Sequence, residues 1–260
     1  MFHVKHPHLD GRQIDGRFHV KHQNSPQIGP RDVQDALSAV GISGSAEAVS
    51  TIALHANAVL EENQRMNLTR VTEPADVLRL HIADSATAAQ AFGGLVDGPI
   101  ADIGSGAGYP GVVLNVLTGR PVTLVESVKK KAAFLARVSK ELALQADVLA
   151  ERAEDVGRER PAAFACVVAR ALSSLPSLVE LAAPLLVKNG RLVAMKGPLD
   201  AEELRRGDAA GRICGMMRSA LYEFELSEGE KRTIICYDKV RGASVPLPRR
   251  SGMAQRHPLA

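Results

Sequence analysis

The stretch PIADIGSGAGYPG at residues 99–111 is the feature that most constrains this 260-residue chain. It reads as a short apolar strand that runs into a glycine-rich turn and opens a helix. Glycine at alternate positions lets the backbone turn sharply and lie close to a ligand, and the following helix N-terminus offers unpaired N–H groups. The stretch therefore predicts a ligand cradle. A glycine-rich turn without a ligand is the alternative that the loop alone leaves open.

The spacing of the glycines indicates which ligand the cradle suits. A dinucleotide site requires Gly-x-Gly-x-x-Gly, and here Tyr109 stands where the last glycine would be. The observed run, Asp102-x-Gly104-x-Gly106-x-Gly108, resembles the S-adenosylmethionine loop of doubly wound methyltransferases. That cofactor has no pyrophosphate and carries positive sulfonium and ammonium groups, so a nearby carboxylate suits it better than a helix dipole alone. The loop thus predicts three cofactor-binding residues: Asp102, Gly104 and Gly106.

The residues after the loop alternate between short apolar runs and helical patterns, which predicts a parallel sheet covered by helices. Aromatic residues make up only 3% of the chain, so we expect a core of Ala, Val, Leu and Ile. Two strand-like runs, 216–226 and 232–240, are separated by a hairpin-type turn and add an antiparallel strand. We therefore expect an α/β fold: a doubly wound, mostly parallel, Rossmann-like seven-stranded sheet with an N-terminal helical cap. The other expected strands are 99–103, 122–125, 146–149, 163–168 and 190–197.

The cap is expected at residues 31–95, where apolar residues recur at helical spacing. Its last helix, from about Pro74 to Phe92, carries His81, Asp84 and Ser85. Residues three and four apart share a helix face, so these side chains can hydrogen-bond one another. A functional pair and a packing pair both remain open.

Both ends of the chain differ in composition from the rest. Residues 1–30 hold the pentapeptide FHVKH twice, and we expect a disordered tail there rather than a histidine metal site, because no acidic or cysteine ligand set accompanies it. The last twenty residues contain four arginines, three prolines and no acid, which predicts an extended basic tail able to contact phosphate. We expect the stretch 96–240 between cap and tail to form the domain that holds the glycine loop, the methyltransferase domain if the loop binds S-adenosylmethionine.

Metal, export and membrane insertion are not expected. The three cysteines are widely spaced without a Cys-x-x-Cys pair, which fits neither a disulfide framework nor a zinc site. The N-terminus lacks the apolar segment of a signal peptide, and no apolar run approaches the length of a membrane span. We therefore expect a cytoplasmic protein with no metal. The cysteines are Cys166, Cys214 and Cys236.

Acidic residues follow the second and third expected strands. Glu126 ends the second strand roughly 20 residues beyond the glycine loop, where an acid accepts hydrogen bonds from ribose hydroxyls. After the third strand, Ala153 is small enough to pass an adenine ring and Glu154 can accept from its amine. These residues predict an adenosine-bearing ligand without choosing between nucleotides and S-adenosylmethionine. The glycine spacing makes that choice.

Basic residues end the fourth and fifth expected strands, where the ligand crevice of such a sheet opens. Arg170 and Lys196 are therefore candidates for positioning the substrate. Neither an Asn-Pro-Pro-Tyr-like turn nor a Pro-Cys nucleophile follows the fourth strand. The helix after Glu126 adds a basic face that is either a nucleic-acid contact or a solvated surface. That face consists of Lys129, Lys130, Arg137 and Lys140.

Taken in order, these motifs resemble those of one family, the bacterial small-subunit ribosomal RNA methyltransferase G, also called glucose-inhibited division protein B. The resemblance covers about residue 31 to the C-terminus. It implies S-adenosylmethionine-dependent methylation of guanine N7 in the decoding-region loop of 16S rRNA, with 16S rRNA or the small ribosomal subunit as partner and no obligate protein partner. The matching motifs are NLT at 67–69, HxxDS at 81–85, the loop 102–111, ES at 126–127, KK at 129–130, FL at 134–135, RAE at 152–154, ARA at 169–171 and KG at 196–197. The implied cofactor contacts are Gly104, Tyr109, Ala153, Glu154 and Arg170.

The missing catalytic motifs agree with this implication. Guanine N7 carries a free lone pair at neutral pH and needs neither a general base nor a covalent nucleophile, so alignment can supply most of the catalysis. Three alternatives remain: a nicotinamide-dependent oxidoreductase on a similar sheet, a non-catalytic RNA-binding module and a small-molecule methyltransferase. Tyr109 argues against the first, the intact loop with Glu126 and Glu154 against the second, and the basic helix and tail against the third.

Overall fold

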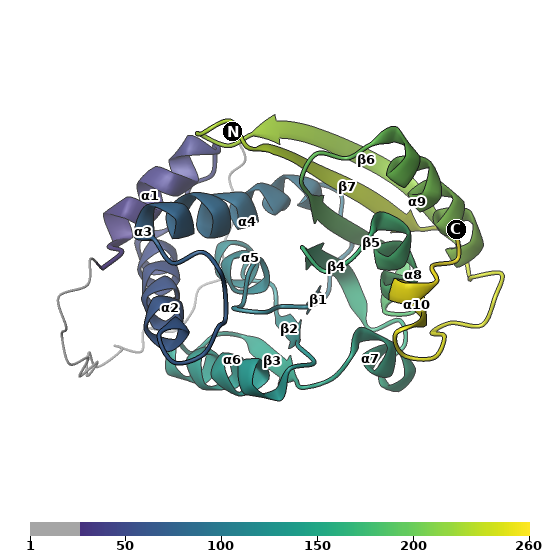
Figure 1. Ribbon diagram of the computed structural model, residues 1–260, viewed down its shortest axis with the longest axis horizontal. Helices are drawn as coiled ribbons and strands as arrows, with labels where there is room; N and C mark the ends of the chain where they lie inside the picture. Colours follow the sequence, from purple (N-terminus) through teal and green to yellow (C-terminus); the bar gives the residue numbers. More distant parts are fainter. Residues whose placement is uncertain (1–26) are drawn as a thin grey trace.

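The computed structural model describes residues 27–260, which are built around one seven-stranded sheet (Figure 1). The strand order is β3-β2-β1-β4-β5-β7-β6; β1 to β5 pair in parallel, and β7 runs antiparallel to both of its neighbours. This order confirms the predicted doubly wound sheet closed by a hairpin. The strands are β1 Ile100–Ile103, β2 Val122–Val125, β3 Ala146–Leu149, β4 Phe164–Arg170, β5 Leu186–Lys196, β6 Met216–Glu225 and β7 Lys231–Lys239.

Helices cover both faces of the sheet (Figure 1). Alternate strand residues point to opposite faces, so Ile100 packs in one core and Ala101 in the other. The first core also contains the N-terminal helices, α5 and α6, and the second contains residues of α7, α8, α9 and α10. None of the helices in residues 27–260 is both long and apolar enough to cross a membrane. The helices after the cap are α5 Gly111–Thr118, α6 Lys129–Glu141, α7 Ala153–Glu159, α8 Leu175–Ala182, α9 Ala201–Cys214 and α10 Met253–Arg256.

The N-terminal helical cap is present, but its last helix is not uniform. After α1 (Pro30–Ala39) and α2 (Ala46–Asn63), residues 74–92 form a continuous run of four helical pieces rather than one α-helix. The wide π turn in the middle brings the Leu80 carbonyl to a side chain from the sheet, described below, and such turns often mark functional positions. The pieces are α3 Pro74–Asp76, the π-helix η1 Val77–Ala83, α4 Asp84–Thr87 and the 3₁₀ helix η2 Ala88–Phe92.

The last twenty residues are not the extended tail that their composition suggested. They fold back over α7 and α8 and include α10 (Figure 1). The Arg249 guanidinium makes two contacts of 2.6 Å with the Glu180 carboxylate, and Glu180 is 2% exposed. The acids that attract this basic segment lie far away in the sequence, so local composition does not reveal them. The duplicated segment falls outside the described residues, and the division of the chain at residues 30, 95 and 240 stays a prediction.

Candidate functional site

The glycine loop joins the C-terminal end of β1 to the first turn of α5. Gly104, Gly106 and Gly108 have φ angles of 76°, 57° and 98°, a region in which only glycine is unstrained. A Cβ on Gly108 would lie 2.8 Å from His55 Nε2, so this glycine allows close packing against the cap. A Cβ on Gly106 would meet only one atom, the Gly104 carbonyl oxygen at 3.9 Å. The backbone of Gly106 is therefore the part of the loop that a ligand can approach most closely.

Asp102 lies beneath the loop and is fully buried. Its Oδ2 accepts a hydrogen bond of 2.9 Å from Gly111 N, which fixes the start of α5, while its Oδ1 has no partner in residues 27–260. Burial raises the pKa of the Asp102 carboxyl to about 7, although the Gly111 N–H and the Arg170 charge act in the opposite direction. An unpaired buried carboxylate oxygen is costly unless a donor or a cation satisfies it. Asp102 therefore suits a positively charged ligand group.

Glu126 follows β2 and ties the loop to the neighbouring strand. Its Oε2 accepts from Gly106 N at 2.9 Å and its Oε1 from Val128 N at 2.7 Å. Each carboxylate oxygen has two lone pairs, so both can accept one more hydrogen bond. Glu126 thus lies next to the open Gly106 backbone, where the sequence prediction needs an acceptor for ribose hydroxyls.

Glu154 has a partner that the sequence did not reveal. Ala153 and Glu154 form the first turn of α7, and both are buried. Glu154 Oε1 accepts a 2.6 Å hydrogen bond from Gly252 N, at the start of α10. One oxygen of the expected adenine acceptor therefore binds the C-terminal segment, and Oε2 has no hydrogen-bond partner in residues 27–260.

Arg170 ends β4 and binds the helical cap. Its Nη1 donates to Leu80 O at 2.7 Å and to Asp84 Oδ2 at 2.9 Å, and its Nη2 lies 3.2 Å from His81 Nδ1. The second oxygen of Asp84 accepts from Arg232 Nε in β7 at 3.2 Å. His81 and Asp84, which the sequence places on one helix face, thus both contact Arg170 of the sheet.

Tyr109 is buried between two histidines of the cap. Its ring stacks on His81 with the centroids 4.7 Å apart and meets the edge of His55 at 4.9 Å, while the Arg170 guanidinium lies 5.8 Å from its centroid. Sequence reasoning missed His55 in α2 and Arg232 in β7. The available signal for His55 was its position among the apolar residues of an amphipathic helix.

Both histidines are neutral. Burial lowers the pKa of His81 to about 3, with the Arg170 charge as the second cause, and burial lowers the pKa of His55 to about 4. His81 Nδ1 lies 3.2 Å from both Arg170 Nη2 and Leu80 O, and its Nε2 lies 2.8 Å from Thr69 Oγ1. His55 Nε2–H donates to Ala107 O in the glycine loop at 3.0 Å. The two residues anchor the loop and the cap rather than exchange protons.

Lys196, at the end of β5, is paired with another element. Its Nζ donates to Ser173 O at 3.0 Å and forms an ion pair of 2.8 Å with Glu203 of α9. Arg170 and Lys196 therefore both lie at the carboxyl edge of the sheet, as predicted, but they share no contact. Lys196 pairs with Glu203, whereas Arg170 shares Asp84 with Arg232.

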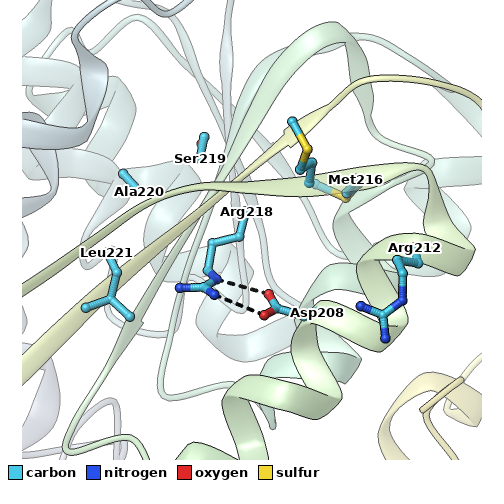
Figure 2. Close-up of a pocket in the computed structure, with 8 residues that line it drawn as sticks. Asp208, Arg212, Met216, Arg218, Ser219, Ala220 and Leu221 are labelled. Atoms are coloured by element: carbon cyan, nitrogen blue, oxygen red, sulfur yellow. Dashed lines mark hydrogen bonds and ion pairs between the residues drawn. The ribbon is translucent and has the colours of Figure 1, made fainter.

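A shallow hollow lies beside β6 and α9 (Figure 2). β6 is the edge strand at the other end of the sheet from β3. Arg218 reaches across it with two 3.1 Å contacts to the Asp208 carboxylate, which also accepts from Tyr237 Oη. These residues neutralise one another and are separate from the glycine loop. The hollow does not belong to the cofactor site.

A comparison with protein families distinguishes between the functions that this site could serve. The family model GidB, described as rRNA small subunit methyltransferase G, matches residues 48–234, which is more than half of the chain. The chain belongs to this family. Proteins named ribosomal RNA small subunit methyltransferase G are similar over nearly their whole length. The protein of Carboxydothermus hydrogenoformans is 35% identical, with 84% of this chain and 95% of the relative covered, and that of Rubrobacter xylanophilus is 34% identical, with 96% and 97% covered.

Solved structures agree with the family at the level of the fold. A geranyl diphosphate C-methyltransferase of Streptomyces coelicolor A3(2), solved with S-adenosyl-L-homocysteine, has a TM-score of 0.51 at 17% identity, covering 66% of this chain and 85% of that one. A geranyl diphosphate methyltransferase solved with sinefungin has a TM-score of 0.50 at 15% identity, covering 60% and 78%. The predicted family, fold class and S-adenosylmethionine dependence are confirmed. As a member of the methyltransferase G family, the chain methylates 16S rRNA.

The residues around the loop fit S-adenosylmethionine. Asp102 offers an unpaired buried oxygen to a cation, Gly106 leaves the loop open on one side, and Glu126 has free lone pairs beside it. The family match therefore favours a methyltransferase over the two alternatives of a nicotinamide-dependent oxidoreductase and a non-catalytic RNA-binding module. Which of the named residues touch the cofactor stays a prediction.

Proposed function

We propose that this member of the methyltransferase G family transfers the methyl group to N7 of a guanine in the decoding-region loop of 16S rRNA. The observation that carries the proposal is that the two histidines next to the glycine loop and the cysteine of the neighbouring strand β4 are not placed to act as base or nucleophile. His55 and His81 have lowered pKa values and bind Ala107 and Arg170. Cys166 is fully buried within β4 and its thiol pKa is raised by burial. Guanine N7 needs neither kind of group.

Bound S-adenosylmethionine supplies the methyl group on a positively charged sulfur. The chain supplies alignment, which can contribute about 7 to 11 kcal/mol to such a reaction. Asp102 offers its carboxylate to a cationic ligand group, and Glu126 fixes the Gly106 backbone. Asp102 lies in β1 and Glu126 directly follows β2, and a site built on the strands of a sheet favours precise positioning.

Methylation at N7 places positive charge on the purine, so unbalanced cations next to the base would oppose it. Asp84 lies 2.9 Å from Arg170 and is shared with Arg232, and Glu203 lies 2.8 Å from Lys196, so carboxylates offset part of this positive charge. We therefore assign Arg170 and Lys196 to positioning the substrate or the cofactor carboxylate, since arginine pairs with guanine edges and with carboxylates through two hydrogen bonds.

We also propose that the protein acts on 16S rRNA or the small subunit in the cytoplasm without an obligate protein partner. Lys129 and Lys130 support an RNA contact, because they are exposed at the start of α6 and form no ion pair within the part of the chain that the structure describes. Arg137 from the predicted basic face is bound to Glu62 and Glu141 instead. The RNA contact is therefore assigned to the lysines at the start of the helix.

The test is to incubate the protein and labelled S-adenosylmethionine with unmodified small subunits, with free 16S rRNA or with a metabolite pool, and to identify the labelled nucleoside after digestion. We expect label in 7-methylguanosine from one of the two RNA substrates. Label in another nucleoside would contradict the assignment to guanine N7, and label only in metabolites would contradict the RNA substrate. A variant with Lys129→Gln and Lys130→Gln should raise KM for RNA and leave KM for the cofactor unchanged.

A further inference from the structure

The C-terminal segment, defined here as residues 247–260, is anchored by an ion pair between the partly exposed Arg249 and the buried Glu180. Arg249 Nε and Nη2 each lie 2.6 Å from an oxygen of Glu180 in α8, and Leu259 N donates to the same carboxylate at 3.3 Å. Glu180 is 2% exposed. A bidentate pair in this environment has a fixed geometry, so it places the backbone on either side of Arg249 accurately.

From this anchor the segment runs along α7. Gly252 N donates to Glu154 Oε1 at 2.6 Å, Ser251 Oγ to Asp155 Oδ1 at 3.1 Å, and Arg158 Nη2 to Arg249 O at 2.9 Å. Three of the seven residues of α7 are thus bound by the segment. A helix this short has little stability of its own and depends on what packs against it.

The first turn of α7 is where the proposed adenine contacts lie. α7 follows β3, the edge strand of the sheet, and packs against α8. Because Gly252 occupies Oε1 of Glu154, the carboxylate is held in one orientation with Oε2 left to accept from a ligand amine. The segment therefore determines both where the turn lies and how its acid points.

We propose that residues 247–260 form a positioning element for the adenosine end of the cofactor site, acting through Arg249 on Glu180 and through Gly252 on Glu154. The proposal rests on the assignment of Ala153 and Glu154 to the cofactor. It concerns a part of the chain beyond residue 234, where the match to the family model ends. Arg249 and Glu180 are positioning residues that touch neither cofactor nor RNA.

The experiment measures binding of S-adenosylmethionine and S-adenosylhomocysteine by calorimetry without RNA, so its outcome does not depend on which nucleoside is methylated. Arg249→Met removes the anchor. This single variant leaves the Glu180 carboxylate buried without a partner. The double variant, Glu180→Gln with Arg249→Met, therefore removes the anchor without leaving an unpaired charge. Arg206→Ala is the matched control, since Arg206 holds only the last residue, with contacts of 3.2 and 2.8 Å to Ala260 O.

We expect both anchor variants to bind the two ligands about tenfold more weakly, a change equivalent to the loss of one good hydrogen bond. KM for RNA and kcat at saturating cofactor should stay within about twofold of the parent, and so should cofactor binding by Arg206→Ala. Unchanged cofactor affinity in the double variant would overturn the proposal. A parallel fall in kcat and RNA affinity would also overturn it, because it would indicate general loosening of the fold.

Discussion

Asp102→Asn should stabilise the protein more at pH 8 than at pH 5. The pKa of this carboxyl is about 7 in the folded protein and 3.8 in an unfolded chain. As pH rises, the unfolded chain therefore loses this proton first, and Asp102 lowers the free energy of unfolding progressively between about pH 4 and pH 7. Asparagine has no such titration, so the difference between variant and parent grows over the same range.

The size of the effect follows from the two pKa values. One pKa unit corresponds to about 1.4 kcal/mol. Between pH 5 and pH 8 the difference in free energy of unfolding between variant and parent therefore changes by about 2 to 3 kcal/mol in favour of the Asn variant. For a chain of this size that is a widening of the Tm difference by roughly 5 to 10 °C. The Asn amide also places an unpaired N–H where Oδ1 lies, at a cost of about 1 to 3 kcal/mol that does not depend on pH.

Urea unfolding of both proteins at pH 5 and pH 8, at constant ionic strength, measures this difference. Other titrating groups are common to the two proteins and cancel. Asp97→Asn, which removes an exposed carboxylate 3.6 Å from Arg120, is the surface control. A stability difference for Asp102→Asn that is constant or shrinks as pH rises would refute the reasoning. The same substitution should weaken S-adenosylmethionine binding by about tenfold or more, because it removes the carboxylate offered to a cation.

Three further substitutions test the loop and the crevice. Gly108→Ala should lower the free energy of unfolding by about 1 to 3 kcal/mol, because its φ is 98° and a Cβ would lie 2.8 Å from His55. Gly119→Ala is the control and should lower the free energy of unfolding less, because the space around Gly119 is open. Equal losses in the two variants would contradict the packing argument. Arg170→Ala should abolish methyl transfer in the labelled assay, and activity close to the parent's would remove Arg170 from the site. Cys166→Ala should retain activity despite a small loss of stability, and inactivity of the folded variant would contradict a mechanism without a nucleophile.

The sheet could be predicted because its signals are local. Strands buried on both faces are continuous apolar runs, and the glycine loop places its turn through residues that tolerate positive φ. The π turn in the cap could not be predicted in the same way. It places the Leu80 carbonyl where Arg170, ninety positions later in the chain, donates to it. No periodicity within residues 74–92 contains that information.

The candidate site likewise has a part that the local sequence predicts and a part that depends on distant contacts. Asp102, Gly106 and Glu126 were predicted from their positions at strand ends, and the structure brings them together. The partners of Glu154 and Arg249 were not predicted, because they depend on contacts of α7 and α8 with one segment that lies 98 positions beyond Glu154 and 69 positions beyond Glu180. The composition of that segment indicated a free basic tail, since the buried acid Glu180 that binds it lies in α8.

Tyr109 connects these two kinds of information. From the spacing alone it served to exclude a dinucleotide, because a glycine was missing. In the fold its ring is 4% exposed and fills the space between His55 and His81, so the side chain points into the cap. The ring therefore connects the loop to α2 and η1, and His55 also binds the Ala107 carbonyl of the loop. Because these contacts hold the loop against the cap, we expect substitutions at the two histidines to lower cofactor affinity.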